Sequence, residues 1–173
     1  MNRTDLLEHF STVHRIVAEA DRFVPTKNRG VAEFRAEIGG LLTVVVASCF
    51  ENAVKSILID YSSRHHFHFG SFIERSYSKL NSRVSINDLN KYCGLAGISV
   101  QADFKARLTA RKRRYLKFSH VEIAKSYEQI LAWRHSYAHS GKKETSIEEA
   151  YRTYREAIGV IISFQEAFEE ACP

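Results

Sequence analysis

Residues 31–61 contain no proline and carry apolar side chains at the three- and four-residue spacing of a helix. Within them, the run TVVVASCF is rich in β-branched residues, and alone it could form a buried strand. The helical period on both sides of that run favours a helix instead. We therefore expect the longest helix of the chain here. Because the chain has only two prolines, most of the rest is also free to be helical.

Further helices are expected at about residues 4–23, 69–80, 101–110, 120–137 and 147–168, from the same periodicity. The first should end just before Pro25, because the residue before a proline resists the α region. Ser119 and Glu122 have the spacing of a capping box for the helix at residues 120–137, and Ser146 can cap the last helix. Residues 83–100 should be irregular, since they hold several helix-breaking residues.

The length of 173 residues and an apolar fraction of 45% indicate one soluble domain, residues 1–173, with a substantial core. The expected fold is an all-α bundle of four to five helices with an irregular basic insertion. A net charge of +5 favours a polyanionic partner. The three cysteines show no metal-binding spacing and fit a reducing compartment, and Cys49, in an apolar run, should be a buried thiol.

The start of the chain, MNRTDLLEHFSTVHR, is too polar and acidic for a signal or transit peptide. The longest apolar run, residues 39–49, is about half of the roughly 20 residues that a membrane-spanning helix needs. We therefore expect a cytoplasmic protein without a membrane segment. His65, His66 and His68 lie close together but lack a companion ligand at metal-binding spacing, so no metal or other cofactor is expected.

The densest basic stretch of the chain is interleaved with Tyr115 and Phe118. Such a stretch can be a solvated face that aids solubility. It can also bind a nucleic-acid backbone, with the aromatic rings stacking on unpaired bases. The sequence leaves both interpretations open, and the cations in question are Lys105, Arg107, Arg111, Lys112, Arg113 and Arg114.

Glu51 and Asn52 are polar residues in the middle of the most apolar expected helix. Either they face solvent or a neighbouring backbone, or Glu51 is a buried carboxylate with a cationic partner, because an unpaired buried charge is costly. Spacing alone favours the first interpretation.

Residues 133–141, WRHSYAHSG, concentrate the groups best suited to chemistry on a phosphate. A guanidinium binds phosphate with a planar set of donors, and an imidazole can accept and donate a proton near neutral pH. Arg134 and His139 could pair with acids and cap helix ends, or His135 and His139 could bind a metal, although no HExxH motif is present. In a third interpretation Arg134 and His139 transfer a phosphoryl group. On an unbroken helix they point about 140° apart, so the helix must end within the motif or a second chain must contribute.

The segment Arg134-His135-Ser136-Tyr137-Ala138-His139 resembles the RX4-6H motif of HEPN ribonuclease domains. The expected bundle, with the motif at the end of its penultimate helix, and the polar pair Glu51-Asn52 on an upstream apolar helix resemble the RiboL-PSP-like members. The resemblance implies a metal-independent RNase that acts as a homodimer. It also implies a toxin or defence effector held in check by an antitoxin or other regulatory protein. Some HEPN domains have lost catalysis and only bind RNA or proteins.

The resemblance also assigns roles to residues. His139 would deprotonate the ribose 2′-OH, Arg134 would neutralise charge on the phosphate oxygens, and Glu51 would orient one of them. His135 would donate a proton to the leaving oxygen or form a structural hydrogen bond. We expect Asn52, Tyr137 and the six cations named above to contact the RNA.

Overall fold

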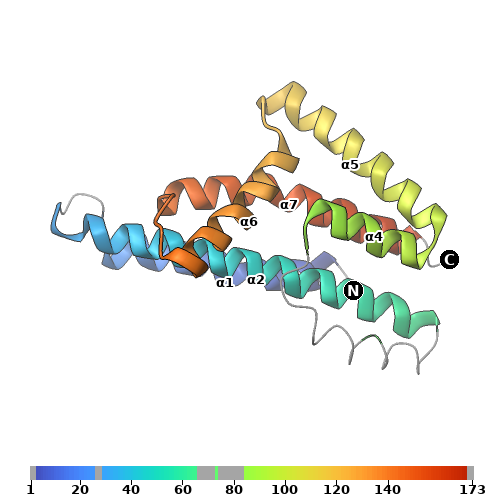
Figure 1. Ribbon diagram of the computed structural model, residues 1–173, viewed down its shortest axis with the longest axis horizontal. Coiled ribbons are helices and arrows are strands. Elements are labelled where there is room, and N and C mark those ends of the chain that lie inside the picture. Colours follow the sequence, from blue (N-terminus) through green and yellow to red (C-terminus); the bar gives the residue numbers. More distant parts are fainter. Residues whose placement is uncertain (1–2, 26–28, 66–72, 74–83, 171–173) are drawn as a thin grey trace.

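The computed structural model describes residues 3–25, 29–65, 73 and 84–170 and places them in an all-α bundle, as the sequence predicted. Figure 1 shows its helices, and a short 3-10 turn, Arg29–Val31, directly precedes the longest of them. The α-helices of the described residues are α1 Arg3–Phe23, α2 Ala32–His65, α4 Ile86–Ala96, α5 Ile98–Ser119, α6 Ile123–Ser140 and α7 Ile147–Glu170.

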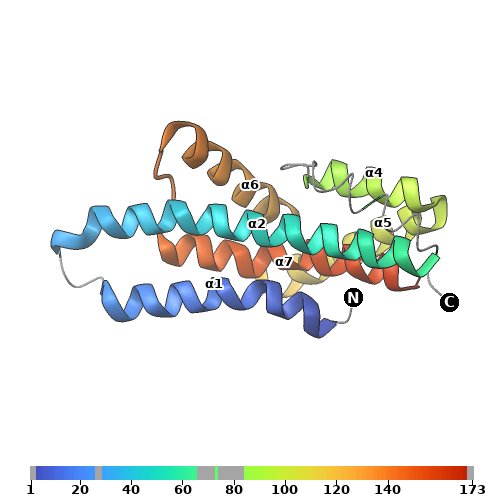
Figure 2. The same cartoon turned by 90° about the horizontal axis from the view of Figure 1, so that it is seen from below.

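Three long helices, α1, α2 and α7, run side by side along the long axis of the molecule (Figure 2). Helix α6 crosses this layer obliquely and packs on both α2 and α7. The α4–α5 hairpin packs on α7 toward its C-terminal end (Figure 1). Because α7 contacts every other α-helix of the described part, its apolar face is the centre of the core.

An aromatic cluster joins four helices within that core. The rings of Phe50 on α2 and Tyr127 on α6 stack with centroids 4.9 Å apart, and Phe10 on α1 meets Tyr154 on α7 at 5.7 Å. All four side chains are buried. The buried Tyr127 hydroxyl is satisfied by donating to the Val84 carbonyl oxygen at 2.6 Å. Aromatic side chains bury large areas, so this cluster fixes how α1, α2, α6 and α7 pack together.

Two adjacent glycines let the end of α6 approach α2 closely. A Cβ atom on Gly40 would lie 2.2 Å from the Tyr137 ring, and one on Gly39 would lie 2.6 Å from the Thr145 carbonyl oxygen. Both distances are far inside van der Waals contact, so a larger residue would push the two elements apart. The motif end of α6 and the connection that follows it are therefore held directly against α2.

Several expected helix ends are confirmed. Helix α1 ends at Phe23, α2 covers the long apolar stretch, and α7 begins after Ser146, whose hydroxyl accepts a hydrogen bond from the Glu149 backbone N–H at 3.1 Å. Cys49 is buried, as predicted, and burial raises the pKa of its thiol. The expected helix at residues 69–80 lies almost wholly outside the described residues, as do His66 and His68.

The expectation that residues 83–100 are irregular is wrong. Ser85 caps α4 by accepting a hydrogen bond from the Asp88 backbone N–H at 3.2 Å, so the polar pair Asn87-Asp88 begins a helix. A single break at Gly97, with φ at 153°, separates α4 from α5. Glycine tolerates this backbone conformation because it has no Cβ.

The basic stretch is also helical, because α5 runs on to Ser119 rather than ending near residue 110. The predicted capping box is wrong for the same reason. Ser119 is the last residue of α5, and Glu122 itself occupies the position before α6 without a side-chain capping bond. The bundle therefore carries a helical hairpin, α4–α5, where an irregular insertion was expected.

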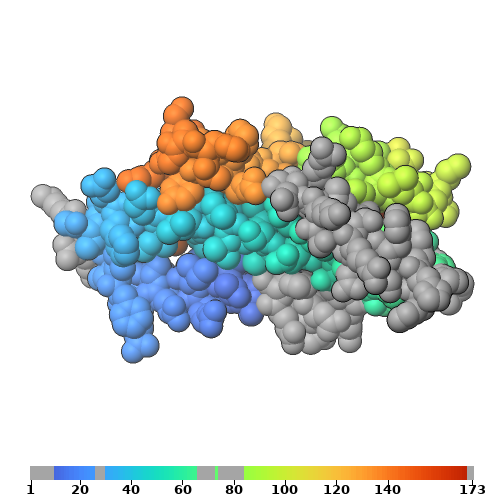
Figure 3. Space-filling model, turned by 60° about the horizontal axis from the view of Figure 1, so that its bottom comes forward, coloured from blue at the N-terminus to red at the C-terminus, as the bar shows by residue number. Residues whose placement is uncertain are grey.

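Helix α2 is long and apolar enough, by length and composition, to cross a membrane. However, 56% of its most apolar window is buried inside the bundle, where α1, α6 and α7 pack on it. Figure 3 shows α2 flanked by α1 and by the end of α6 on one face of the molecule. This covering is typical of the core helix of a soluble helical domain.

Candidate active site at the end of helix α6

The whole motif lies within α6, which ends only after it. The helix stops at Gly141, whose φ of 64° is left-handed and whose backbone N–H bonds to the Tyr137 carbonyl oxygen at 2.9 Å. The possibility that the helix ends inside the motif is therefore excluded. Arg134 and His139 project about 140° apart on this continuous helix.

Arg134 leans toward α2 and meets Glu51. Its Nη2 lies 3.7 Å from Glu51 Oε1, and the two side chains are only 27% and 16% exposed. Glu51 is therefore a largely buried carboxylate with a cationic partner, which is the interpretation that spacing alone did not favour. The acid holds the guanidinium on the side of α6 next to α2. Its neighbour Asn52 is exposed.

His135 and His139 occupy the opposite, outward face of the same helix end. Both are exposed, and their ring centroids lie 4.3 Å apart. Two imidazoles alone do not form the three-ligand protein site that a catalytic zinc ion requires. Among the described residues, no group of three or more His, Cys, Asp and Glu could hold a metal ion. Because both rings are exposed, the pair is accessible for proton transfer at the surface.

Tyr137 anchors the motif rather than reaching outward. Its ring packs over Gly40, and its hydroxyl donates to Glu37 Oε2 at 2.9 Å, while Lys143 Nζ lies 2.5 Å from Glu37 Oε1. Hydrogen bonds from Lys143 and Tyr137 lower the pKa of Glu37, and the bond to Glu37 raises the pKa of Tyr137. Because its hydroxyl is engaged within the chain, Tyr137 is better described as a positioning residue than as an RNA contact.

Sequence reasoning missed Glu37, Lys143 and Arg35. Arg35, which is buried, bonds to Asp21 Oδ1 at 3.1 Å and also to the carboxylate of Glu148. It thereby links α1, α2 and the start of α7. The partners lie far apart in the chain, so spacing gave no signal for either group of residues.

The expected RNA-binding cations divide into two sets. Arg107 bonds to Asp103 at 2.6 Å and to Glu170, and Arg111 donates two bonds to Glu166 at 2.7 and 2.8 Å. These two guanidinium groups are occupied in joining α5 to α7, which argues against the expected RNA contact. Hydrogen bonds to Glu170 and Asp103 raise the pKa of Arg107. The other cations are exposed, and they are Lys105, Lys112, Arg113 and Arg114.

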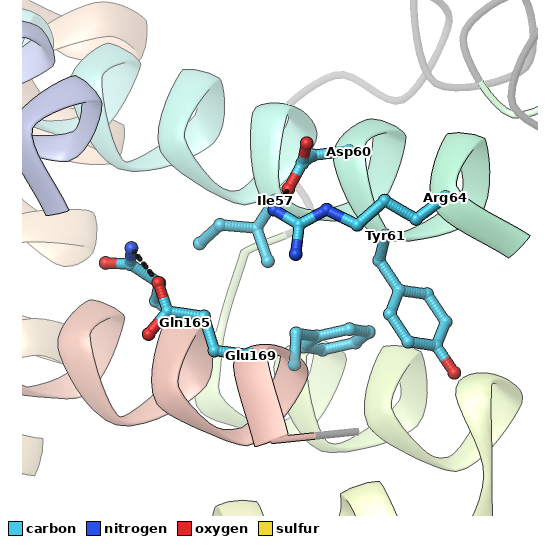
Figure 4. A pocket seen from close by; sticks show the side chains of 7 residues that line it. Ile57, Asp60, Tyr61, Arg64, Gln165 and Glu169 are labelled. Carbon is cyan, nitrogen blue, oxygen red and sulfur yellow. Dashed lines mark hydrogen bonds and ion pairs between the residues drawn. The ribbon is translucent and has the colours of Figure 1, made fainter. Parts of the chain in front are cut away.

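A small cavity lies between α2 and α7, toward the C-terminal end of each helix (Figure 4). Its volume is about 10 Å³, which is room for a single water molecule at most. Arg64 pairs with Asp60 across one turn of α2, and Gln165 donates to Glu169 at 2.7 Å on α7. These polar groups satisfy one another at the helix contact, so this cavity is not a substrate site.

The fold and the site together define a class. An all-α bundle whose helix α6 ends in an Arg-x4-His motif, with an acid from a long core helix on the arginine, is a HEPN-type domain. A family model described as RiboL-PSP-HEPN matches residues 3–170, and the chain therefore belongs to this family, as the sequence resemblance predicted. The searches of curated proteins and of solved structures found no match.

Proposed function

We propose that this protein is a metal-independent endoribonuclease that leaves a 2′,3′-cyclic phosphate and a 5′-OH. One observation supports this most directly. The arginine of the motif is held by Glu51 at 3.7 Å, while two imidazoles lie exposed at the same helix end. A guanidinium held by an acid and exposed proton-transfer groups are what an attack by a ribose hydroxyl requires.

The proton transfers and the charge neutralisation use side chains of the motif, while Glu51 on α2 orients Arg134. His139 accepts the proton of the ribose 2′-OH, and the 2′ oxygen forms a bond to the adjacent phosphorus. Arg134 neutralises the charge that builds on the non-bridging oxygens. The bond from phosphorus to the 5′ oxygen then breaks, and an imidazolium, from His135 or from a second chain, donates the proton that this oxygen takes up. The need for a 2′-OH makes DNA a non-substrate.

A second copy of the chain completes the site. Within one chain the directions of Arg134 and His139 diverge, so a single phosphate cannot meet both. A two-fold axis beside the motif would place the guanidinium of one protomer opposite the imidazole of its partner. Phe34 and Leu41 support such an interface, because they lie seven residues apart on one face of α2 and are 56% and 52% exposed.

In the cell, the proposed enzyme is a cytoplasmic toxin or defence effector, and an antitoxin or other regulatory protein keeps it inactive. This role is the one that the resemblance of the motif to HEPN ribonuclease domains implies. A non-catalytic RNA- or protein-binding module is the second candidate function. The divergence of Arg134 and His139 favours it for a chain that stays monomeric.

The test is cleavage of single-stranded RNA in EDTA, with product ends identified by mass spectrometry. We expect a 2′,3′-cyclic phosphate that is absent from reactions with Arg134→Ala and with His139→Ala. His120→Asn is the matched control, because His120 is an exposed histidine outside the motif with a left-handed φ of 54° that asparagine tolerates. RNA that is bound but never cut would support the binding module instead. Cleavage only with added divalent metal would refute the metal-free mechanism.

Mixing the two inactive variants tests the shared site. A mixed dimer of Arg134→Ala and His139→Ala holds one site with both groups intact, one from each chain. We expect equal mixing to restore about a quarter of the wild-type rate, because half of the dimers are mixed and each has one working site. Light scattering should give twice 19.8 kDa. A monomer with full activity would refute the dimer.

A further inference from the structure

The C-terminal half of α5 is densely cationic. The sequence contains no acidic residue between Asp103 and Glu122. Arg107 and Arg111 turn inward to the acids of α7, and Arg111 also donates to the Ser163 hydroxyl at 3.0 Å. The remaining cations are exposed and make no ion pair with an acid of the described residues, and they are Lys112, Arg113, Arg114 and Lys117. We call these four residues the α5 basic surface.

Aromatic and apolar groups lie among these cations. Arg111, Arg114, Tyr115, Phe118 and Ser119 line an open hollow of about 560 Å³. Phe118 is 73% exposed, and Lys117 Nζ lies 5.4 Å from the centre of its ring. Exposed rings beside cations match the chemistry of an unpaired RNA segment, whose phosphates need charge and whose bases need a stacking surface. An acidic protein surface could form ion pairs with the cations but has no bases to stack on the Phe118 ring.

The α5 basic surface and the motif lie at opposite ends of α6 (Figure 1). From Ile123 to His139 the helix rises about 24 Å at 1.5 Å per residue. An RNA strand stacked at about 3.4 Å per nucleotide needs roughly seven nucleotides to cover that length. A stacked substrate of three or four nucleotides is therefore too short to cover that length.

We propose that the α5 basic surface is an RNA-docking site that holds a single-stranded segment of the substrate, separate from the phosphate that is cut. The proposal rests on the proposed function in one respect, namely that the RNA held at the α5 basic surface is the same strand that the motif cuts. The docking site raises the affinity for long substrates and leaves the chemistry at the motif unchanged.

The test compares two variants that lose equal charge. The docking variant replaces the α5 basic surface by glutamine, and the matched control replaces four exposed cations on α1 and α7, namely Arg15, Arg22, Arg152 and Arg155. Each is combined with His139→Ala and titrated with a fluorescent 20-nucleotide single-stranded RNA over a salt series. Circular dichroism confirms that both variants remain folded.

We expect the docking variant to bind the 20-mer roughly tenfold more weakly, with a salt slope reduced by about 0.7 for each phosphate that it no longer neutralises. The control should bind as the unmodified protein does. Phe118→Ala should weaken binding without changing the slope, because stacking releases no counterions. Equal weakening in both variants, or unchanged binding in both, would overturn the proposal. Two further results would overturn it. One is that the unmodified protein binds an RNA duplex as tightly as the single-stranded 20-mer. The other is that it binds a 20-residue polyglutamate equally well and the docking variant does not.

Cleavage separates this proposal from the proposed function. With His139 restored, the docking variant should cut a four-nucleotide RNA at the unmodified rate and show a higher KM for the 20-mer at an unchanged kcat. If the unmodified protein binds the 20-mer through the α5 basic surface but cuts no RNA, the proposed nuclease function is refuted and the docking site is still supported. Equal loss of activity on both lengths would refute the separate docking site.

Discussion

Arg111 is the residue for which the structure most changes the expectation drawn from the sequence. In the sequence it is one of four consecutive cations, and in the fold its side chain is 24% exposed and its guanidinium bonds both carboxylate oxygens of Glu166 on α7. Its stem also packs on α7, since a Cβ on Gly159 would lie 3.1 Å from Arg111 Cδ. We therefore predict that Arg111→Gln weakens the fold but not RNA binding.

The magnitude follows from the hydrogen bonds that the Arg111 guanidinium makes. A hydrogen bond to a charged partner contributes about 1.5–3 kcal/mol, and because Glu166 is partly exposed and water replaces part of the loss, we expect about 2 kcal/mol in total. The buried Ser163 hydroxyl keeps a partner, because it donates to the Gly159 carbonyl oxygen at 2.9 Å. For a domain of this size, a loss of about 2 kcal/mol lowers Tm by roughly 4–8 °C.

The assay is urea unfolding followed by circular dichroism, together with titration by the 20-nucleotide RNA. Arg114→Gln is the matched control, because Arg114 is exposed in the same helix and its replacement should change stability by less than about 0.5 kcal/mol. We expect opposite results for the two variants. Arg111→Gln should be less stable than wild type and bind the RNA with normal affinity, whereas Arg114→Gln should keep wild-type stability and bind the RNA more weakly. Wild-type stability with reduced RNA affinity in Arg111→Gln would refute this assignment.

Three further predictions concern the surroundings of the motif and the core. Gly40→Ala places a Cβ 2.2 Å from the Tyr137 ring, so it should cost about 1–3 kcal/mol in urea unfolding and lower the cleavage rate by displacing the helix end; an unchanged Tm would contradict the close packing. Because Lys143 and Tyr137 lower the pKa of Glu37, Glu37→Gln should be less stable than wild type at neutral pH. The difference should shrink as pH falls below 4.5, and a constant difference would show that charge is not involved. Burial raises the pKa of Cys93 to about 12, so peptide mapping should find this thiol alkylated only after unfolding in urea.

The helical periodicity of the sequence predicted most of the fold, because α1, α2 and α7 each bury one apolar face. It failed at α4 and α5, where polar residues and glycines were taken as breaks. Asn and Asp are unfavourable within a helix but favourable in its first turn, and Ser85 supplies the cap that places them there. Gly94 is tolerated within the last turn of α4, so of these two glycines Gly97 alone interrupts the helix.

The candidate site was predictable only as far as local spacing reaches. The motif itself is a contiguous pattern, but the helix that carries it runs on to Ser140, beyond the end expected at about residue 137. The contacts that hold it come from α2, which precedes it by many residues, so the pairing of Glu51 with Arg134 and of Glu37 with Tyr137 depends on the tertiary fold. The same limit explains why Arg111 and Arg114, with identical side chains three residues apart, could not be distinguished in the sequence.

The central place of α7 has a consequence for synthesis of the protein. The ribosome makes the described helices in chain order, and the helix that contacts all the others is made after them. Until α7 has left the exit tunnel, the apolar faces of α2 and α6 lack the cover that α7 provides, and a nascent chain that includes the motif still lacks its packed core. The motif is therefore synthesised before the helix that completes its packing, and a chain interrupted before α7 carries no pre-formed site. For a protein proposed to cut RNA, activity then begins only after its own core has been translated.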